Sequence, residues 1–446
     1  MQGNSAVAGQ GGYPSAVSGW YLVFVLYIAY TLSFVDRTII AFLVGPIRAD
    51  LHITDFQFSL LNGLAFVIFY AVLGIPIGRM VDSYNRRQLV VIGVAFWSVM
   101  TALCGVASTF WQLFVTRLGV GVGEATLSPS AVSMLSDSFP PEKRGLAISM
   151  FAAGIHAGAG MANIFGGIVV MFSMGGALTV LPLLGELRPW QLAFILVALP
   201  GILVVGLLYT VREPLRRERS RGSSGASFAG TLSYMRQHWL VYTTLIIGAA
   251  FSAMSMYGAF QWVPAMYQRS FGWNPGQIGW YIGLLTIIGG TGSMFFSGWL
   301  AGVLLKKGVT GVYPKIMMSA MLLAIGPALL LVMRNDPYWS LIWLGCLVVL
   351  LSAPIGLVQA ALQAISPNET RGMIIAVYLF FVAVIGTGGG PSAVAAMTDF
   401  YYHNDAMVGH SIAWLVGVTA AISALLQFIA IGAYKRKAAV TDFSGT

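Results

Sequence analysis

The chain is a succession of apolar segments, most of them about 20 residues long, which is the length of a helix that crosses a bilayer. Of its 446 residues, 57% are apolar and only 9% are charged, whereas soluble proteins carry roughly 25% charged residues. Such a chain could not cover its surface in water. Because lipid offers no partners to backbone polar groups, the segments must be helices. The sequence therefore predicts an all-α polytopic membrane protein.

The polar breaks predict twelve transmembrane helices in two pseudo-symmetric six-helix bundles. The expected helices are 19–47, 56–77, 88–108, 111–136, 145–173, 190–211, 239–268, 276–304, 314–333, 338–365, 373–399 and 408–434. The chain then divides into a disordered tail (1–18), an N-terminal bundle (19–211), a polar linker (212–238), a C-terminal bundle (239–434) and a C-terminal tail (435–446).

The distribution of Lys and Arg predicts the orientation. Eighteen of the 24 basic residues fall in breaks on one side, and four, Arg48, Arg188, Arg269 and Arg334, fall on the other. Because cytoplasmic loops carry the excess of basic residues, both termini are expected in the cytoplasm. Short loops and tails favour the inner membrane of a bacterium. The net charge of +9 lies in these short loops, so it indicates membrane topology and not a nucleic-acid partner.

An internal repeat relates the two halves. Gln57–Gly63 matches Gln277–Gly283 at an offset of 220, and Arg86 and Arg87 match Lys306 and Lys307 at the same offset. Each match lies at a helix start or in a loop, in the same order and on the same side. Parallel six-helix repeats joined by a long linker are typical of one large group of secondary transporters.

Two motifs carry a family resemblance. Gly78–Arg87, with Asp82 four residues after the Gly, and Arg117–Ala125, with Gly121 and Gly123, resemble signatures of the major facilitator superfamily. Within it, the chain is most similar to the spinster group of lipid transporters, on Phe34–Arg37, Gly123–Ala125 and Thr387–Ser392. The resemblance implies alternating access and proton-driven movement of an amphiphile of the lysophospholipid or sphingosine-phosphate class.

Four charged residues lie within expected spans: Asp36, Arg37, Arg117 and Glu124. An intramembrane charge costs about 2.5–3.5 kcal/mol on insertion scales, so two acids and two bases are expected to compensate one another. Our hypothesis is that Asp36 and Glu124 take up and release protons while the two arginines tune them. The alternative is a static ion-pair cluster that fixes the first helix against the fourth.

A cytoplasmic gate is expected at the loop that follows the second helix. Its residues are Gly78, Asp82, Arg86, Arg87 and Arg144. Asp82 could pair with Arg87 or Arg144 and hold this face shut in one state. The alternative is that Asp82 only solvates the loop.

The substrate cavity is expected between helices 1, 4, 7 and 10, which line it in the superfamily. Its candidate residues are Tyr30, Thr31, Phe34, Tyr257, Phe260, Gln261, Trp262, Gln359 and Gln363. Aromatic groups with sparse amides and hydroxyls beside two arginines suit an amphiphile with an anionic head. Each aromatic could instead face lipid or pack between helices.

Other readings remain open. His156, within a Gly-rich stretch, could relay protons or only pack against its neighbours. The protein could be a passive facilitator, or could carry another small organic anion or a drug. A membrane-embedded lipid enzyme is a remote alternative, because no nucleophile motif or metal-binding motif occurs. No cofactor is expected, Cys104 and Cys346 read as small apolar residues, and we expect a monomer whose partners are its lipid substrate, protons and membrane lipids.

Overall fold

The computed structural model describes residues 13–63, 65, 67, 76–77, 80–81, 83–175, 180–181, 185–216 and 228–442. Within them, ten helical segments are long and apolar enough to cross a membrane. The other two expected spans are 56–77, which lies partly outside the described residues, and 111–136, which divides into two shorter helices. The predicted all-helical membrane fold is confirmed.

The N half, residues 16–216, begins with α1 (Ala16–Thr38), a 3-10 turn (Ile39–Phe42) and the short α2 (Val44–Leu51). Its further elements are α3 (Asp55–Asn62), α5 (Arg86–Cys104), α6 (Phe110–Glu124), α7 (Leu127–Ser138), α8 (Pro141–Met174), β1 (Val180–Leu181), β2 (Gly185–Glu186), α9 (Pro189–Ala198) and α10 (Pro200–Thr210). The two strands form a minimal antiparallel hairpin between α8 and α9.

The C half, residues 228–442, begins with α11 (Phe228–Gln237) and α12 (Trp239–Phe271). It continues through α13 (Pro275–Leu285), α14 (Thr291–Lys306), α15 (Val312–Leu330), α16 (Pro337–Ser352), α17 (Pro354–Ile365), α18 (Asn368–Phe381), α19 (Gly390–Ala396) and α20 (Val408–Asp442). π-helical turns at Thr286–Gly290, Val382–Gly389 and Met397–Tyr402 and a 3-10 turn at Asp405–Met407 join these helices.

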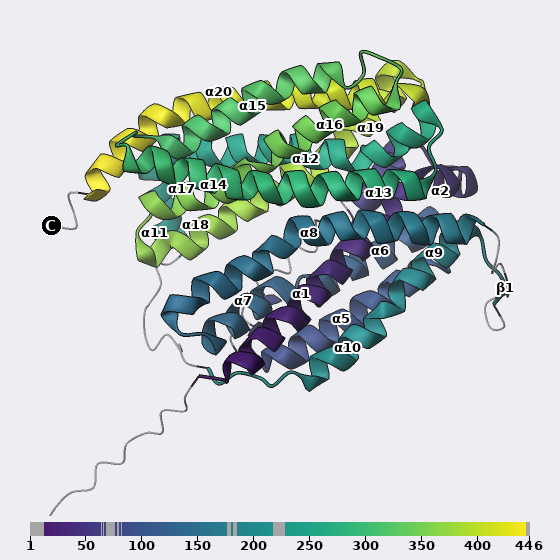
Figure 1. Cartoon of the computed structure of the whole chain (residues 1–446), viewed down its shortest axis with the longest axis horizontal. Coiled ribbons are helices and arrows are strands. Elements are labelled where there is room, and N and C mark those ends of the chain that lie inside the picture. The colour runs from purple at the N-terminus through teal and green to yellow at the C-terminus, as the bar shows by residue number, and fades with distance from the viewer. Residues whose placement is uncertain are drawn as a thin grey trace, which may run out of the picture.

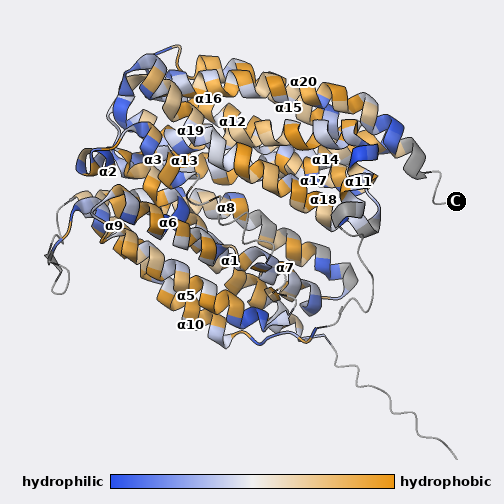
Figure 2. Cartoon of the chain, turned by 180° about the vertical axis from the view of Figure 1, so that it is seen from behind, coloured by the Kyte–Doolittle hydropathy of each residue, from blue (hydrophilic) through white to orange (hydrophobic). Residues whose placement is uncertain are grey.

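Figure 1 shows the two halves side by side, with their helices running between two ends of the molecule. We call the end where α1 begins and α20 finishes the termini face, and the opposite end, where α2 lies, the distal face. Figure 2 shows apolar residues along the helices and polar residues gathered at the ends. Large apolar side chains such as Phe295 (70% exposed) and Trp299 (62%) cover a surface suited to lipid.

The sequence repeat reappears as the same local structure in both halves. Thr54 and Gln57 form a capping box at the start of α3, and Asn274 and Gln277 form one at the start of α13. In each box the cap side chain accepts from the backbone of the third helical residue, whose Gln side chain accepts from the cap backbone. The predicted repeat is thus visible as two equivalent helix starts at the distal face.

The halves approach most closely where α8 packs against α13. A Cβ atom on Gly279 would lie 2.4 Å from the carbonyl oxygen of Asn163, and one on Gly167 would lie 2.4 Å from that of Pro275. Only glycine allows two backbones to come this close. The position of these glycines therefore fixes the closed arrangement at the distal side of the interface.

Several boundaries differ from the expected ones; α1, for example, begins at Ala16, inside the expected disordered tail (1–18). Helix 4 breaks between α6 and α7 because Pro129 has no N–H to donate to the carbonyl of Ala125. The expected C-terminal tail begins inside α20, which continues to Asp442 because its Lys, Arg and Ala residues favour helix. Within the expected polar linker (212–238), residues Phe228–Gln237 form the helix α11.

Candidate functional site

The cluster of buried charges forms where α1, α5 and α6 meet. Asp36 lies near the end of α1 and its side chain is fully buried. Neither of its carboxylate oxygens has a hydrogen-bond partner among the described residues. The indole of Trp97 and the hydroxyl of Thr101, both on α5, are the uncharged polar groups beside it. A buried carboxyl group without hydrogen bonds is costly when ionised, so Asp36 is a candidate for a proton-carrying group.

Arg117 reaches Asp36 from α6. Its Nη1 donates a 3.0 Å hydrogen bond to the backbone carbonyl of Asp36, and not to the carboxylate. Its Nε and Nη2 have no hydrogen-bond partner among the described residues, although the whole side chain is buried. The guanidinium thus sits beside a carboxyl group with which it has formed no hydrogen bond.

Arg37 and Glu124 form a direct ion pair between α1 and α6. Glu124 is almost fully buried, whereas the Arg37 side chain keeps 24% of its exposure. The Arg37 guanidinium also lies 5.3 Å from the centre of the Phe34 ring, within reach of a cation–π contact. The structure therefore brings together all four charged residues predicted for proton coupling.

The aromatic residues predicted on helix 1 form one cluster next to Arg37. Tyr30 stacks on Phe151 of α8, with ring centres 4.8 Å apart, and meets Phe34 edge-on at 5.2 Å. Thr31 lies against Gly158 of α8, and its hydroxyl has no partner among the described residues. Tyr30, Thr31 and Phe34 are half-buried and lie about one to two helical turns before Arg37.

The predicted cavity residues of the C half differ in their exposure. Tyr257, Phe260, Gln261 and Gln359 are half-buried and Gln363 is exposed. Trp262 instead lies in the core: it is 1% exposed and its Nε1 donates to the carbonyl of Pro391 at 2.9 Å. Its neighbours are the Phe58 ring and the Arg269 guanidinium. Trp262 therefore packs in the interface between the halves and does not line a cavity in this conformation.

Of the residues predicted for the gate, Gly78 and Asp82 lie outside the described residues. Arg86 is buried and forms an ion pair with Asp137 of α7 and another with Glu213 at 2.8 Å. Arg87 donates to the carbonyl of Val211 at 3.1 Å. These partners all belong to the N half, so both arginines anchor the start of the linker. Arg144 lies in the first turn of α8, and the gate itself stays a prediction.

His156 lies on α8 in the interface between the halves. It is 5% exposed, and its Nδ1 has no hydrogen-bond partner among the described residues. Its ring packs against Gly290, where an added Cβ would lie 2.3 Å from the ring. The geometry favours the packing role over the relay role that the sequence left open.

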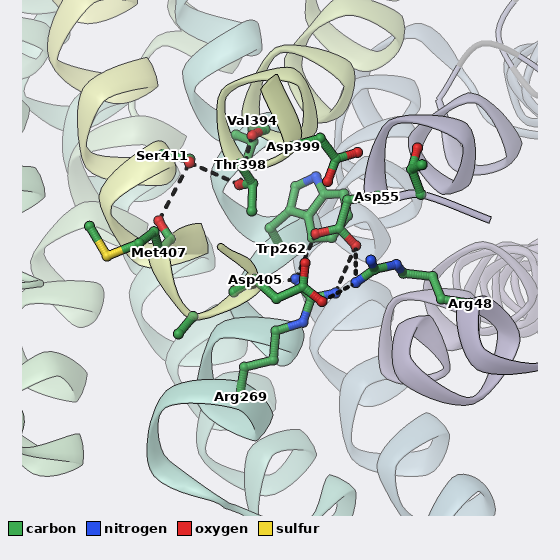
Figure 3. A network of polar contacts seen from close by, with 12 residues as sticks. Arg48, Asp55, Trp262, Arg269, Val394, Thr398, Asp399, Asp405, Met407 and Ser411 are labelled. Carbon is green, nitrogen blue, oxygen red and sulfur yellow. Dashed lines mark hydrogen bonds and ion pairs between the residues drawn. The ribbon is translucent and has the colours of Figure 1, made fainter. Parts of the chain in front are cut away.

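A second charge network closes the distal face, and no sequence pattern predicts it directly (Figure 3). Arg269 of α12 donates to both oxygens of the buried Asp55 of α3, at 2.6 and 2.7 Å. Arg48 of α2 pairs with Asp55 at 3.0 Å and with Asp405 at 2.5 Å. Asp399 accepts from the backbone N–H of Phe56 at 2.7 Å. The network joins the two halves at the distal face.

Three carboxylates of this network, Asp55, Asp399 and Asp405, lie within 4.8 Å of one another. Such a group can hold a cation, but here Arg48 and Arg269 supply the positive charge. We interpret this network as a set of ion pairs that holds the two halves together, and we call it the distal lock. The sequence signal that could have found it is the pairing of an acid at the start of α3 with the basic end of α12, 214 residues away.

Two bundles that enclose buried charges and meet at a charged lock define a secondary transporter of the membrane and not an enzyme. The chain belongs to the Major Facilitator Superfamily, whose model matches residues 26–391. It is similar to the crystal structure of a bacterial homologue of the human lysosomal transporter spinster in an inward-facing, unoccupied conformation. That match has 26% identity and a TM-score of 0.79, and it covers 95% of this chain and 98% of the other.

Two relatives mark the range of functions near this chain. An MFS-type efflux pump of Mycolicibacterium smegmatis is 26% identical over 422 residues, which cover 94% of each chain. Protein spinster of Drosophila melanogaster is 24% identical over 403 residues, which cover 86% of this chain and 62% of that protein. The predicted membership of the superfamily and likeness to spinster are confirmed.

Proposed function

We propose that this chain is a proton-coupled transporter that moves an amphiphilic lipid of the lysophospholipid or sphingosine-phosphate class by alternating access. The observation that carries the proposal is the carboxyl group of Asp36. It is fully buried and has no hydrogen bond among the described residues, while Arg117 beside it donates to the backbone instead. A carboxyl group in this setting is stable when it carries a proton and needs a cation when it does not.

Arg37, next to Asp36, is a second possible partner for an ionised Asp36 carboxylate, besides Arg117. The cluster holds two acids and two bases, and in this structure Arg37 forms its ion pair with Glu124. Loss of the proton from Asp36 leaves a charge that Arg117 or Arg37, the two cations of the cluster, can compensate. Re-pairing of these arginines would shift α1 against α6, and this shift is the step that couples proton movement to a change of conformation.

The closed distal face indicates the state of the transporter. Arg269, Asp55 and Arg48 join the halves there, and the similar spinster homologue has been solved inward-facing. With the termini in the cytoplasm, as the distribution of basic residues predicts, the closed distal face is the outer one. A carrier closed on its outer face exchanges its substrate with the cytoplasmic side.

The substrate class rests on the cluster beside Arg37. A cation next to Tyr30, Phe34 and Phe151 offers one charged contact and a larger apolar surface, which suits an anionic head attached to a chain. The second candidate is export of a small organic compound or drug, which the full-length likeness to an efflux pump favours. In both cases the same cluster couples protons.

The experiment uses the full chain in liposomes with an imposed pH gradient. Movement of fluorescent lysophosphatidylcholine, sphingosine phosphate and a drug-like dye is followed in parallel vesicles. The proposal expects gradient-dependent movement of at least one lipid, and no acceleration by the gradient in empty liposomes. Movement of the dye alone would reject the lipid assignment and favour the second candidate. Movement that ignores the gradient would reject proton coupling.

A further inference from the structure

A cavity of about 290 Å³ opens at the termini face, where α11 meets α12 and the end of α20. Its polar lining comes from Gln237, His238, Trp239, Arg436 and Lys437. It lies in the C half, at the opposite end of α12 from Arg269 and the distal charge network. The cavity combines cationic, amide and indole groups, which are all hydrogen-bond donors.

The charge of this cavity is positive. The segments that form it, residues 228–241 and 430–438, carry Arg236, Lys435, Arg436 and Lys437 and no Asp or Glu. Arg436 is exposed, and Lys437 is half-buried. Four cations without an acid in the same segments create a local field that attracts anions.

Lys437 is held in a defined position. Its Nζ lies 2.9 Å from Nε2 of His238 and 4.8 Å from the centre of the Tyr234 ring. Burial and the charge of Lys437 lower the pKa of His238 below its ordinary value of 6.5, so the imidazole is neutral near pH 7 and accepts from the ammonium. The ammonium therefore has a fixed place in the wall of the cavity.

The start of α12 adds a further attraction for an anion. His238 is the N-cap residue of this 33-residue helix, but its side chain makes no capping hydrogen bond. Trp239 to Val241, the first residues of α12, line the cavity. Backbone N–H groups at the start of a helix favour a negative charge.

The cavity also lies at the level of lipid headgroups. Trp239 is 61% exposed at the first position of a membrane-spanning helix, where Trp side chains mark the membrane interface. Leu232 of the adjacent α11 is 54% exposed, as expected for a helix that lies along a lipid surface. Any anion that enters this cavity is therefore within reach of the bilayer.

We propose that this cavity binds the phosphate of an anionic phospholipid headgroup from the leaflet at the termini face, between Arg436, Lys437 and the start of α12. The acyl chains of that lipid remain in the bilayer beside Trp239. A lipid bound here fastens the end of the linker, α11, to α12 and α20, and stabilises the C half. The site is independent of the transported substrate.

The test uses the full chain in mild detergent and native mass spectrometry, with thermal unfolding as a second readout. Phosphatidylglycerol and phosphatidylcholine are titrated in separate samples. Each basic residue near an anionic headgroup contributes about 1 kcal/mol, so Arg436→Gln should weaken phosphatidylglycerol binding about fivefold and Arg436→Gln/Lys437→Gln about 30-fold. The matched control is Lys306→Gln/Lys307→Gln, an exposed basic pair outside the cavity, which should bind as the native chain does.

Two further outcomes would overturn the proposal. Equal losses in the cavity variant and in the Lys306/Lys307 control would show general charge attraction and no site. Inorganic phosphate or glycerol phosphate is added without lipid in a separate arm, where no stabilisation is expected at millimolar concentration. Stabilisation by these ions equal to that by phosphatidylglycerol would assign the cavity to a free phosphate instead of a lipid headgroup.

Discussion

Arg269 of α12 donates two hydrogen bonds to the carboxylate of Asp55 of α3, at 2.6 and 2.7 Å, and so connects the C half to the N half at the distal face. The Asp55 carboxylate is fully buried and also forms an ion pair with Arg48. Such a pair opposes separation of the halves, because opening must expose or unpair both charges. Opening of the distal face therefore requires the Arg269–Asp55 ion pair to break.

Asp55→Asn should shift the population toward a distally open state. Removal of one partner of a buried ion pair costs about 3–5 kcal/mol, which is enough to reverse a two-state population that favours the closed form. Spin labels at positions 108 and 335, on the distal loops of the two halves, measure the separation in a cysteine-free background. The matched control is Asp50→Asn, whose partner Arg188 lies in the same half. Unchanged distances in Asp55→Asn would reject the lock.

Gly279→Ala should also open the distal side. Its added Cβ would lie 2.4 Å from the carbonyl oxygen of Asn163, closer than real Cβ atoms come, so α13 must move away from α8. The same pair of spin labels should report longer distances. Gly292→Ala, where nothing lies within 4 Å of the added atom, provides the comparison. Equal behaviour of the two variants would mean that the close approach is not required for closure.

The buried charges could be predicted because intramembrane charge is rare and costly. Asp36, Arg37, Arg117 and Glu124 stood out within apolar runs, and cost alone implied that they meet. The membrane fold followed similarly from the apolar segments and from the repeat. The two capping boxes at Thr54 and Asn274 are its structural counterpart.

The distal lock could not be predicted in the same way. Asp55 and Arg269 lie near the ends of helices, where charges are ordinary, and no local pattern connects residues so far apart in the chain. Trp262 is a cavity candidate because the family resemblance implies that helix 7 lines the cavity, but a helix of low amphipathicity does not reveal which of its faces turns inward. Glu213, the partner of Arg86, was missed because it belongs to the linker.

Arg86→Gln should destabilise the N half. Arg86 is 1% exposed and joins Asp137, Glu213 and the carbonyl of Pro214, so its loss removes charge-assisted hydrogen bonds from carboxylates that are mostly buried, at a cost of about 1.5–3 kcal/mol. Thermal unfolding in detergent should show a clearly lower midpoint. Arg87→Gln, which loses bonds to backbone carbonyls only, should lower it less. If Arg86→Gln unfolds at the native temperature, the anchor role is wrong.

His238 should make the stability of the protein sensitive to acid. Burial, followed by the charge of Lys437, lowers its pKa in the folded chain below 6.5. The folded chain then binds fewer protons than the unfolded chain, so stability is lost as the pH falls from about 6.5 toward the folded-state pKa. His238→Gln should reduce the loss between pH 7.5 and pH 5 in thermal unfolding. An identical loss of stability in both proteins would show that His238 does not cause the sensitivity to acid.

The most direct test of proton coupling compares the native chain with Asp36→Asn in two assays on the same liposomes. One assay is exchange of substrate at equal pH on both sides, and the other is uptake driven by a pH gradient. The account predicts that Asp36→Asn keeps exchange and loses acceleration by the gradient, while Asp50→Asn keeps both. Gradient-driven uptake that survives in Asp36→Asn would contradict the account, and loss of exchange as well would reduce Asp36 to a structural role.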